Sequence, residues 1–94
     1  MTLTYADAMA IVDANYRPLW GGSFGTFYVS PEGEEDDEAF LVPWGAREYL
    51  VDDDLNYLLI NNTVTLVMKA TGEIEQHNTP LIFDRLNAMR PVTA

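Results

Sequence analysis

Carboxylates dominate the chemistry that this sequence offers, and most of them fall within one quarter of the chain. Six of the seven residues in the first acidic run (residues 32–38) are Asp or Glu, and three more acids form the second acidic run (residues 52–54). Residues 32–54 hold ten acids and one base, Arg47, which is a net charge of −9. Clustered carboxylates attract cations, either a basic protein surface or a metal ion.

Three interpretations of the two acidic runs are open. They are solvated loops that keep the protein in solution, a footprint for a basic partner, or ligands for Ca²⁺. The ordered D-x-[DN]-x-[DN]-G calcium loop is absent, so nothing in the spacing sets a ligand geometry. We therefore assign no metal site and keep solvation and partner binding as the main alternatives.

Trp44 stands between the two acidic runs, after a proline and before a glycine. A large aromatic side chain in a small domain is either part of the core or, beside acids, an anchor for a partner. Both alternatives stay open for this residue. The predicted partner-binding residues are Glu34, Glu35, Asp36, Asp37, Glu38, Trp44, Asp52, Asp53 and Asp54.

The remaining residues do not form a recognisable catalytic set. The chain has no cysteine and one histidine, His77, which we expect at a strand end, facing solvent or a neighbouring side chain. Ser23 and Ser30 lack the strand-turn-helix context of an activated serine. The glycines at 21–25 lack the lysine of a phosphate-binding loop. We predict no enzymatic activity, no catalytic residue and no cofactor.

Size and charge restrict the partners. Ninety-four residues predict a single domain, residues 1–94, and 48% hydrophobic residues suffice for a core. The net charge of −10 predicts repulsion from nucleic acids and from anionic membranes. No signal peptide or long apolar segment is visible, so we expect the protein to be cytoplasmic. We also expect it to be a monomer or a weak homodimer.

The elements that position these residues follow from local patterns. Thr4 and Asp7 form a capping box, and an apolar stripe then predicts a helix that ends near Tyr16, before Pro18. The residues of this stripe are Tyr5, Ala8, Met9, Val12 and Tyr16.

Strands are predicted at 24–29, 39–42, 63–69 and 74–77, and residues 47–51 are expected to continue the strand at 39–42 or to form a short further strand. The strand at 63–69 is indicated by the alternation of Val64, Leu66 and Met68 with Thr63, Thr65 and Val67. Residues 30–38 and 52–54 are expected as loops, near one edge of the sheet if the strands between them form a hairpin. Residues 55–60 fit either a strand or a helical turn. Gly72 suits a hairpin turn between the last two strands.

Thr79 as the N-cap and Pro80 at the first helical position predict the start of a short C-terminal helix. Its apolar face comprises Ile82, Phe83, Leu86 and Met89; Arg90 stands at its end, and Pro91 stops it. The fold class is therefore α+β, with an N-terminal helix, a three- to four-stranded antiparallel sheet and a short C-terminal helix.

Residues 63–74, in which an apolar strand runs into a T-G-E-I turn, resemble a motif of small bacterial domains. PepSY-type domains and the YrhB-like immunity proteins of toxin systems share this hairpin after an N-terminal helix, to which residues 5–12 are similar. Met68 stands where those domains have an acid. The resemblance covers about twenty residues and implies a non-enzymatic domain that binds a protein.

These observations favour an interaction protein, such as an inhibitor, immunity protein or antitoxin-like binder, that engages a basic protein surface through acidic loops. Two alternatives are kept. A phage or mobile-element protein that mimics DNA would spread its carboxylates along an elongated surface. A small phage structural or accessory protein would instead associate with itself through its sheet edges.

Overall fold

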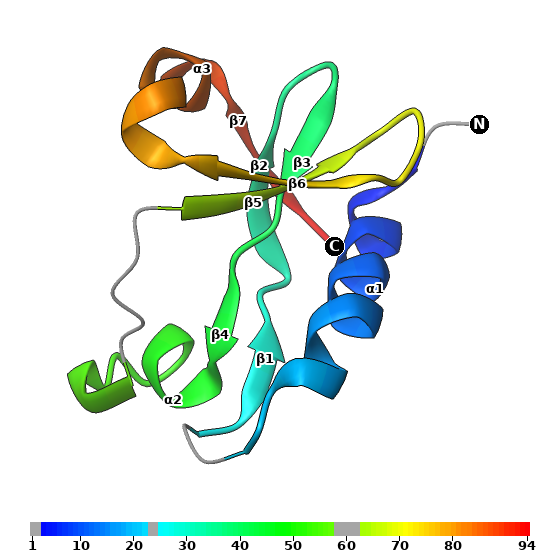
Figure 1. Ribbon diagram of the computed structural model, residues 1–94. Coiled ribbons are helices and arrows are strands. Elements are labelled where there is room, and N and C mark those ends of the chain that lie inside the picture. The colour runs from blue at the N-terminus through cyan, green and yellow to red at the C-terminus, as the bar shows by residue number, and fades with distance from the viewer. Residues whose placement is uncertain (1–2, 23–24, 58–62) are drawn as a thin grey trace.

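The computed structural model describes residues 3–22, 25–57 and 63–94, and its fold is α+β, as predicted (Figure 1). Helix α1 (Tyr5–Tyr16) begins at the predicted capping box. The hydroxyl of Thr4 accepts a hydrogen bond from the Asp7 amide at 3.2 Å, and the Asp7 carboxylate accepts one from the Thr4 amide at 2.9 Å. The chain then tightens into the short helix η1 (Arg17–Leu19), which contains Pro18.

Antiparallel strands form two sheets in the described part of the chain. The five-stranded sheet has the order β6-β5-β3-β2-β7, and the two-stranded sheet pairs β1 with β4. The strands are β1 (Phe27–Val29), β2 (Glu32–Glu35), β3 (Ala39–Leu41), β4 (Trp44–Ala46), β5 (Thr63–Met68), β6 (Ile74–Asn78) and β7 (Arg90–Thr93).

The core lies between α1 and one face of these sheets. Tyr5, Ala8 and Val12 are buried on the predicted stripe of α1, and they pack with Phe40 and Val67 of the large sheet. Phe40 and Val67 are direct cross-strand partners, so they point to the same face. Because successive strand residues alternate, Leu66, which is fully buried, faces the other side. Figure 1 shows α1 and the C-terminal helix α3 on opposite sides of the β5–β6 pair.

The β5–β6 hairpin matches the prediction. Val67 pairs with Ile74, and Gly72 adopts the left-handed conformation that the turn requires, with φ 77°. His77 lies on β6, and its Nε2 is 2.8 Å from the Glu75 carboxylate. The imidazole therefore faces a neighbouring side chain, which is one of the two predicted environments.

The prediction of a loop at residues 30–38 is wrong, because residues 32–35 form strand β2. This strand lies between β3 and β7, and its backbone pairs with both neighbours. Asp and Glu are poor strand formers. Here the backbone pairing on two sides, which a local pattern does not reveal, decides the conformation. The turn that ends β2 carries Asp36, Asp37 and Glu38.

Residues 47–51 do not continue a strand either. Residues Arg47–Leu50 form the single-turn helix α2, and Leu55–Tyr57 form the 3₁₀ turn η2; the rest of the ambiguous segment, 58–60, lies outside the described residues. Val42 and Pro43 carry the chain from the large sheet to β4 in the small one, so Pro43 and Gly45 mark a change of sheet. Strand β1 begins at Phe27, and Phe24 lies outside the described residues.

The C-terminal region differs from the prediction in two respects. Residues Thr79–Ile82 form the 3₁₀ helix η3 and Phe83–Ala88 form α3, with Asn78 and not Thr79 at the capping position. Arg90 and Pro91 belong to β7, which the sequence patterns did not predict. Pro91 is tolerated because β7 is an edge strand. Phe83 is 57% exposed, so the predicted apolar face is only partly covered.

Candidate functional site

Half of the six acids in the first acidic run form ion pairs with the chain's own bases. Glu35, at the end of β2, accepts a hydrogen bond from Lys69 Nζ at 2.6 Å and lies 3.8 Å from the Arg90 guanidinium. Both side chains of the Glu35–Lys69 pair are mostly covered, with 20% and 13% exposure. Asp37, which is almost fully exposed, is 3.4 Å from Arg90.

Asp36 organises the turn between β2 and β3. Its carboxylate accepts hydrogen bonds from the amides of Glu38 and Ala39 and, at 2.7 Å, from Arg85 Nε on α3. The bond from Arg85, supported by the two amides, lowers the pKa of Asp36 to about 2. This residue therefore connects the turn to α3, so part of the first acidic run has a structural role. Glu34 and Glu38 form no ion pair with the described residues.

The second acidic run has a different environment. Asp52 and Asp53 are exposed, and the Asp54 carboxylate accepts a hydrogen bond from the Asn56 amide at 3.0 Å. Asp53 has φ 56°, a left-handed conformation that Asp tolerates in turns. Within the part of the chain that the structure describes, no Lys, Arg or His forms an ion pair with these three carboxylates.

The two acidic runs do not share an edge of the sheet, and that expectation is wrong. Figure 1 shows the β2–β3 turn at one end of the molecule and the segment after α2 at the other. The cause is the change of sheet at Val42 and Pro43, which directs β4 and α2 away from the large sheet. The predicted site residues therefore divide into two groups.

Trp44 packs against the core, as one of the two sequence alternatives predicted, and it also lines a pocket. The indole is half-buried, packs against the core and stacks on Tyr16 with ring centres 4.4 Å apart and planes 11° apart. Its Nε1 donates to the Thr65 hydroxyl at 2.8 Å, which links the small sheet to the large one. The same residue also lines a pocket.

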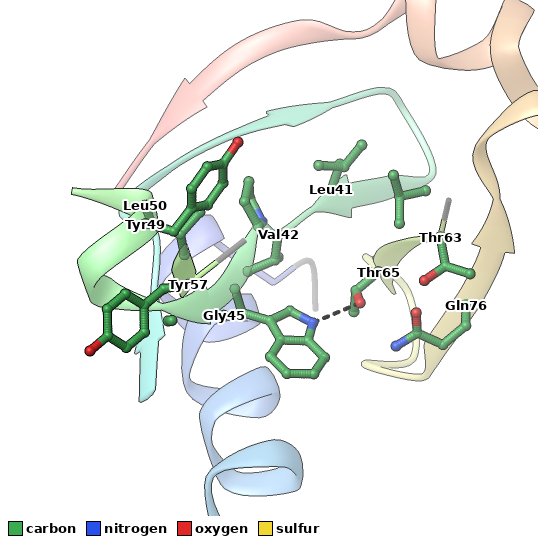
Figure 2. A pocket seen from close by; sticks show the side chains of 13 residues that line it. Leu41, Val42, Gly45, Tyr49, Leu50, Tyr57, Thr63, Thr65 and Gln76 are labelled. Atoms are coloured by element: carbon green, nitrogen blue, oxygen red, sulfur yellow. Dashed lines mark hydrogen bonds between the residues drawn. The ribbon is translucent and has the colours of Figure 1, made fainter. Parts of the chain in front are cut away.

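This pocket, of about 230 Å³, lies where α2 and β4 face the last residue of β3 and the first residues of β5 (Figure 2). Figure 2 shows Tyr49 and Tyr57 on one side and Thr63, Thr65 and Gln76 on the other. The second acidic run follows Leu50 and precedes Tyr57, two lining residues, so the backbone of these acids is close to the pocket along the chain.

Glu48 holds this wall of the pocket in place. Its carboxylate accepts the Thr26 amide at 2.9 Å and 3.0 Å, and the Arg47 amide donates to the Thr26 carbonyl at 2.8 Å. The bond from the Thr26 amide lowers the pKa of Glu48. Helix α2 is thereby connected to the segment that leads into β1, so Tyr49 and Leu50 have a defined position.

Sequence patterns did not identify several residues of the pocket. Tyr49 and Leu50 were assigned to a strand, and Tyr57, Thr63 and Gln76 were not considered as site residues. Their spacing along the chain gives no common period, because they come from α2, η2, β5 and β6. The cluster of tyrosines around the second acidic run was the one local signal available.

Two further properties concern the described residues. In residues 3–22, 25–57 and 63–94, no three His, Asp or Glu side chains are arranged to hold a metal ion. In the same part of the chain, no helix has the length and apolar character needed to cross a bilayer.

Comparison with protein-family models, with curated proteins and with solved structures found no match for this chain.

Proposed function

We propose that this protein is a non-enzymatic binding domain, of the inhibitor or immunity-protein type, that engages a basic surface of another protein. The observation that carries the proposal is the second acidic run beside the Trp44 pocket. Its three carboxylates have no ion pair with the described residues, and along the chain they lie between Leu50 and Tyr57, two residues that line this pocket. Acids steer a basic partner, and aromatic side chains supply contact area.

The first acidic run supports this proposal because it pairs with most of the bases in the chain. Lys69, Arg85 and Arg90 are paired with Glu35, Asp36 and Asp37, and Arg17 is paired with Asp13 at 2.7 Å. Because most of the few bases are engaged in this manner, the remaining carboxylates determine the outer field of the molecule. That field attracts cations and repels phosphates.

Mimicry of DNA is less well supported. A mimic needs rows of free carboxylates at regular spacing, whereas three acids of the first run are neutralised by neighbouring bases. The two groups of acids lie at opposite ends of the molecule in Figure 1, and the three acids of the second group have no ion pair with the described residues. The proposal therefore concentrates on the end that carries the pocket.

The test compares two triple variants with equal loss of charge. One replaces Asp52, Asp53 and Asp54 by Asn, and the matched control replaces Glu32 and Glu73 by Gln and Asp84 by Asn, three exposed acids elsewhere. A fluorescent decalysine peptide is titrated at low and high salt. We expect the first variant to weaken binding roughly tenfold and the control to weaken it much less, with both differences reduced at high salt.

Equal losses in the two variants would show that only total charge matters, and the proposed site would be abandoned. Unchanged binding in both variants would overturn the proposal of an acidic binding surface as a whole.

A further inference from the structure

The pocket beside Trp44 has a chemical bias of its own. None of its thirteen lining residues is charged, yet residues 47–54, which include the lining residues Tyr49 and Leu50, contain four acids and one base, a net charge of −3. Asp52 follows Leu50 by two residues, so its Cα lies within about 7–8 Å of the lining. That distance is below the Debye length of about 8–10 Å at physiological salt, so the field of the acids reaches the pocket.

Two hydrogen-bonding groups of the pocket, on Trp44 and Gln76, favour a ligand that donates hydrogen bonds. The indole N–H of Trp44 is already donated to Thr65, so it is not offered to a ligand. Gln76 Nε2 donates a hydrogen bond to the Tyr16 hydroxyl at 2.7 Å. The Oε1 atom of the same amide remains as an acceptor. A ligand that only donates hydrogen bonds suits such a surface, and the guanidinium of arginine has five donors and no acceptor.

The walls of the pocket favour a flat cation. Trp44, Tyr49 and Tyr57 supply aromatic rings, and cations are attracted to the faces of such rings. Guanidinium is planar and weakly hydrated, so it stacks on aromatic rings at a lower desolvation cost than the ammonium of lysine. Leu41, Val42 and Leu50 add apolar surface for the aliphatic part of the side chain.

The size of the pocket limits the occupant. A volume of about 230 Å³ is below the roughly 300–1,000 Å³ of pockets that take drug-sized ligands. One long side chain fits this space better than a cofactor. We propose that the Trp44 pocket binds the side chain of one arginine of the basic partner. This inference rests on the proposed function and specifies its anchor.

The test uses three small probes of similar shape. N-acetyl-arginine amide, N-acetyl-citrulline amide and N-acetyl-lysine amide are titrated into the whole protein, and binding is followed by the NMR signals of the two indole N–H groups. The Trp44 signal should shift on titration with the arginine probe, and the Trp20 signal should shift less. Citrulline, which is neutral, should bind at least about fivefold more weakly, and lysine should also bind more weakly than arginine.

Two variants locate the effect. Gln76→Leu removes the free acceptor and Tyr57→Leu removes a ring, and each should weaken binding of the arginine probe about threefold or more. Leu81→Ala, at an exposed position that does not line the pocket, is the control and should have no effect. Circular dichroism spectra and melting temperatures establish that the variants are folded.

The outcomes distinguish the two proposals. Equal affinity for citrulline and arginine, tighter binding of lysine, or no shift of the Trp44 signal would overturn the arginine anchor. If decalysine binding still depended on the second acidic run, the proposed function would stand without this anchor. Loss of both effects would overturn both.

Discussion

Lys69 reaches across a whole strand to bind Glu35. Its Nζ lies 2.6 Å from Glu35 Oε1 and 4.7 Å from the centre of the Phe40 ring. Lys69 follows β5 and Glu35 ends β2, while β3, which carries Phe40, lies between these strands. The ammonium is thus held over an aromatic ring and against a carboxylate, a combination that stabilises a mostly covered cation.

Replacing Lys69 by Met should remove this contact and leave Glu35 partly covered without its closest partner. We expect the free energy of unfolding to fall by about 1–3 kcal/mol, less than for a fully buried pair. Arg17→Met is the matched control, because the Arg17–Asp13 pair is exposed and screened by water and should contribute less than the Lys69–Glu35 pair. Urea denaturation at neutral pH measures both. A smaller loss for Lys69→Met than for Arg17→Met would contradict the structural role of the pair.

The Asp36 carboxylate should make stability depend on pH. Its pKa is about 2 in the folded protein, below its ordinary value of 3.8. The stabilisation is therefore present above pH 4 and is lost as pH falls towards 2. Because the side chain is 23% exposed, we expect Asp36→Asn to cost about 1–2 kcal/mol at pH 6 and progressively less below pH 4.

Urea denaturation of Asp36→Asn and of the native sequence, at intervals from pH 6 to pH 2, checks this expectation. Asp84→Asn, at an exposed acid, serves as the control and should change stability by less than about 0.5 kcal/mol. A difference between the native protein and Asp36→Asn that stays constant from pH 6 to pH 2 would refute the assignment.

Gly33 is required by close packing over β2. A Cβ built at this residue would collide with the Leu41 carbonyl oxygen and lie 2.7 Å from Cε1 of Tyr5, whose hydroxyl donates to the Ser30 carbonyl. We expect Gly33→Ala to destabilise the protein by about 1–3 kcal/mol, as overpacking does. Glu32→Ala in the same strand, at an exposed position, is the control. Thermal denaturation compares the two, and equal melting temperatures would argue against the close approach.

Leu66 should contribute strongly to stability, because it is fully buried in the centre of β5. Leu66→Ala is expected to cost about 2–4 kcal/mol through lost contacts and a residual cavity. Leu81→Ala makes the same chemical change at a residue that is 79% exposed, and it should cost less than about 0.5 kcal/mol. Chemical denaturation gives both values. A loss below 1 kcal/mol for Leu66→Ala would mean that β5 is not buried as the structure places it.

Local patterns in the sequence were sufficient for three elements. The capping box of Thr4 and Asp7 and the apolar stripe predicted α1, the alternation from Val64 to Met68 predicted β5, and Gly72 predicted the hairpin turn. Each signal lies within a few residues of the structure that it specifies. A helix cap, a pleat and a left-handed turn are decided by short-range sterics and hydrogen bonds.

Tertiary structure alone decided the conformation of the first acidic run and the existence of the pocket. Residues 32–35 form a strand because β3 and β7 pair with them, and Asp37 meets Arg90 from 53 residues away. The pocket gathers residues from β3, β4, α2, η2, β5 and β6 at the place where the chain changes sheets. Such pairings gain their energy only after distant segments meet, so no short window of the sequence contains them.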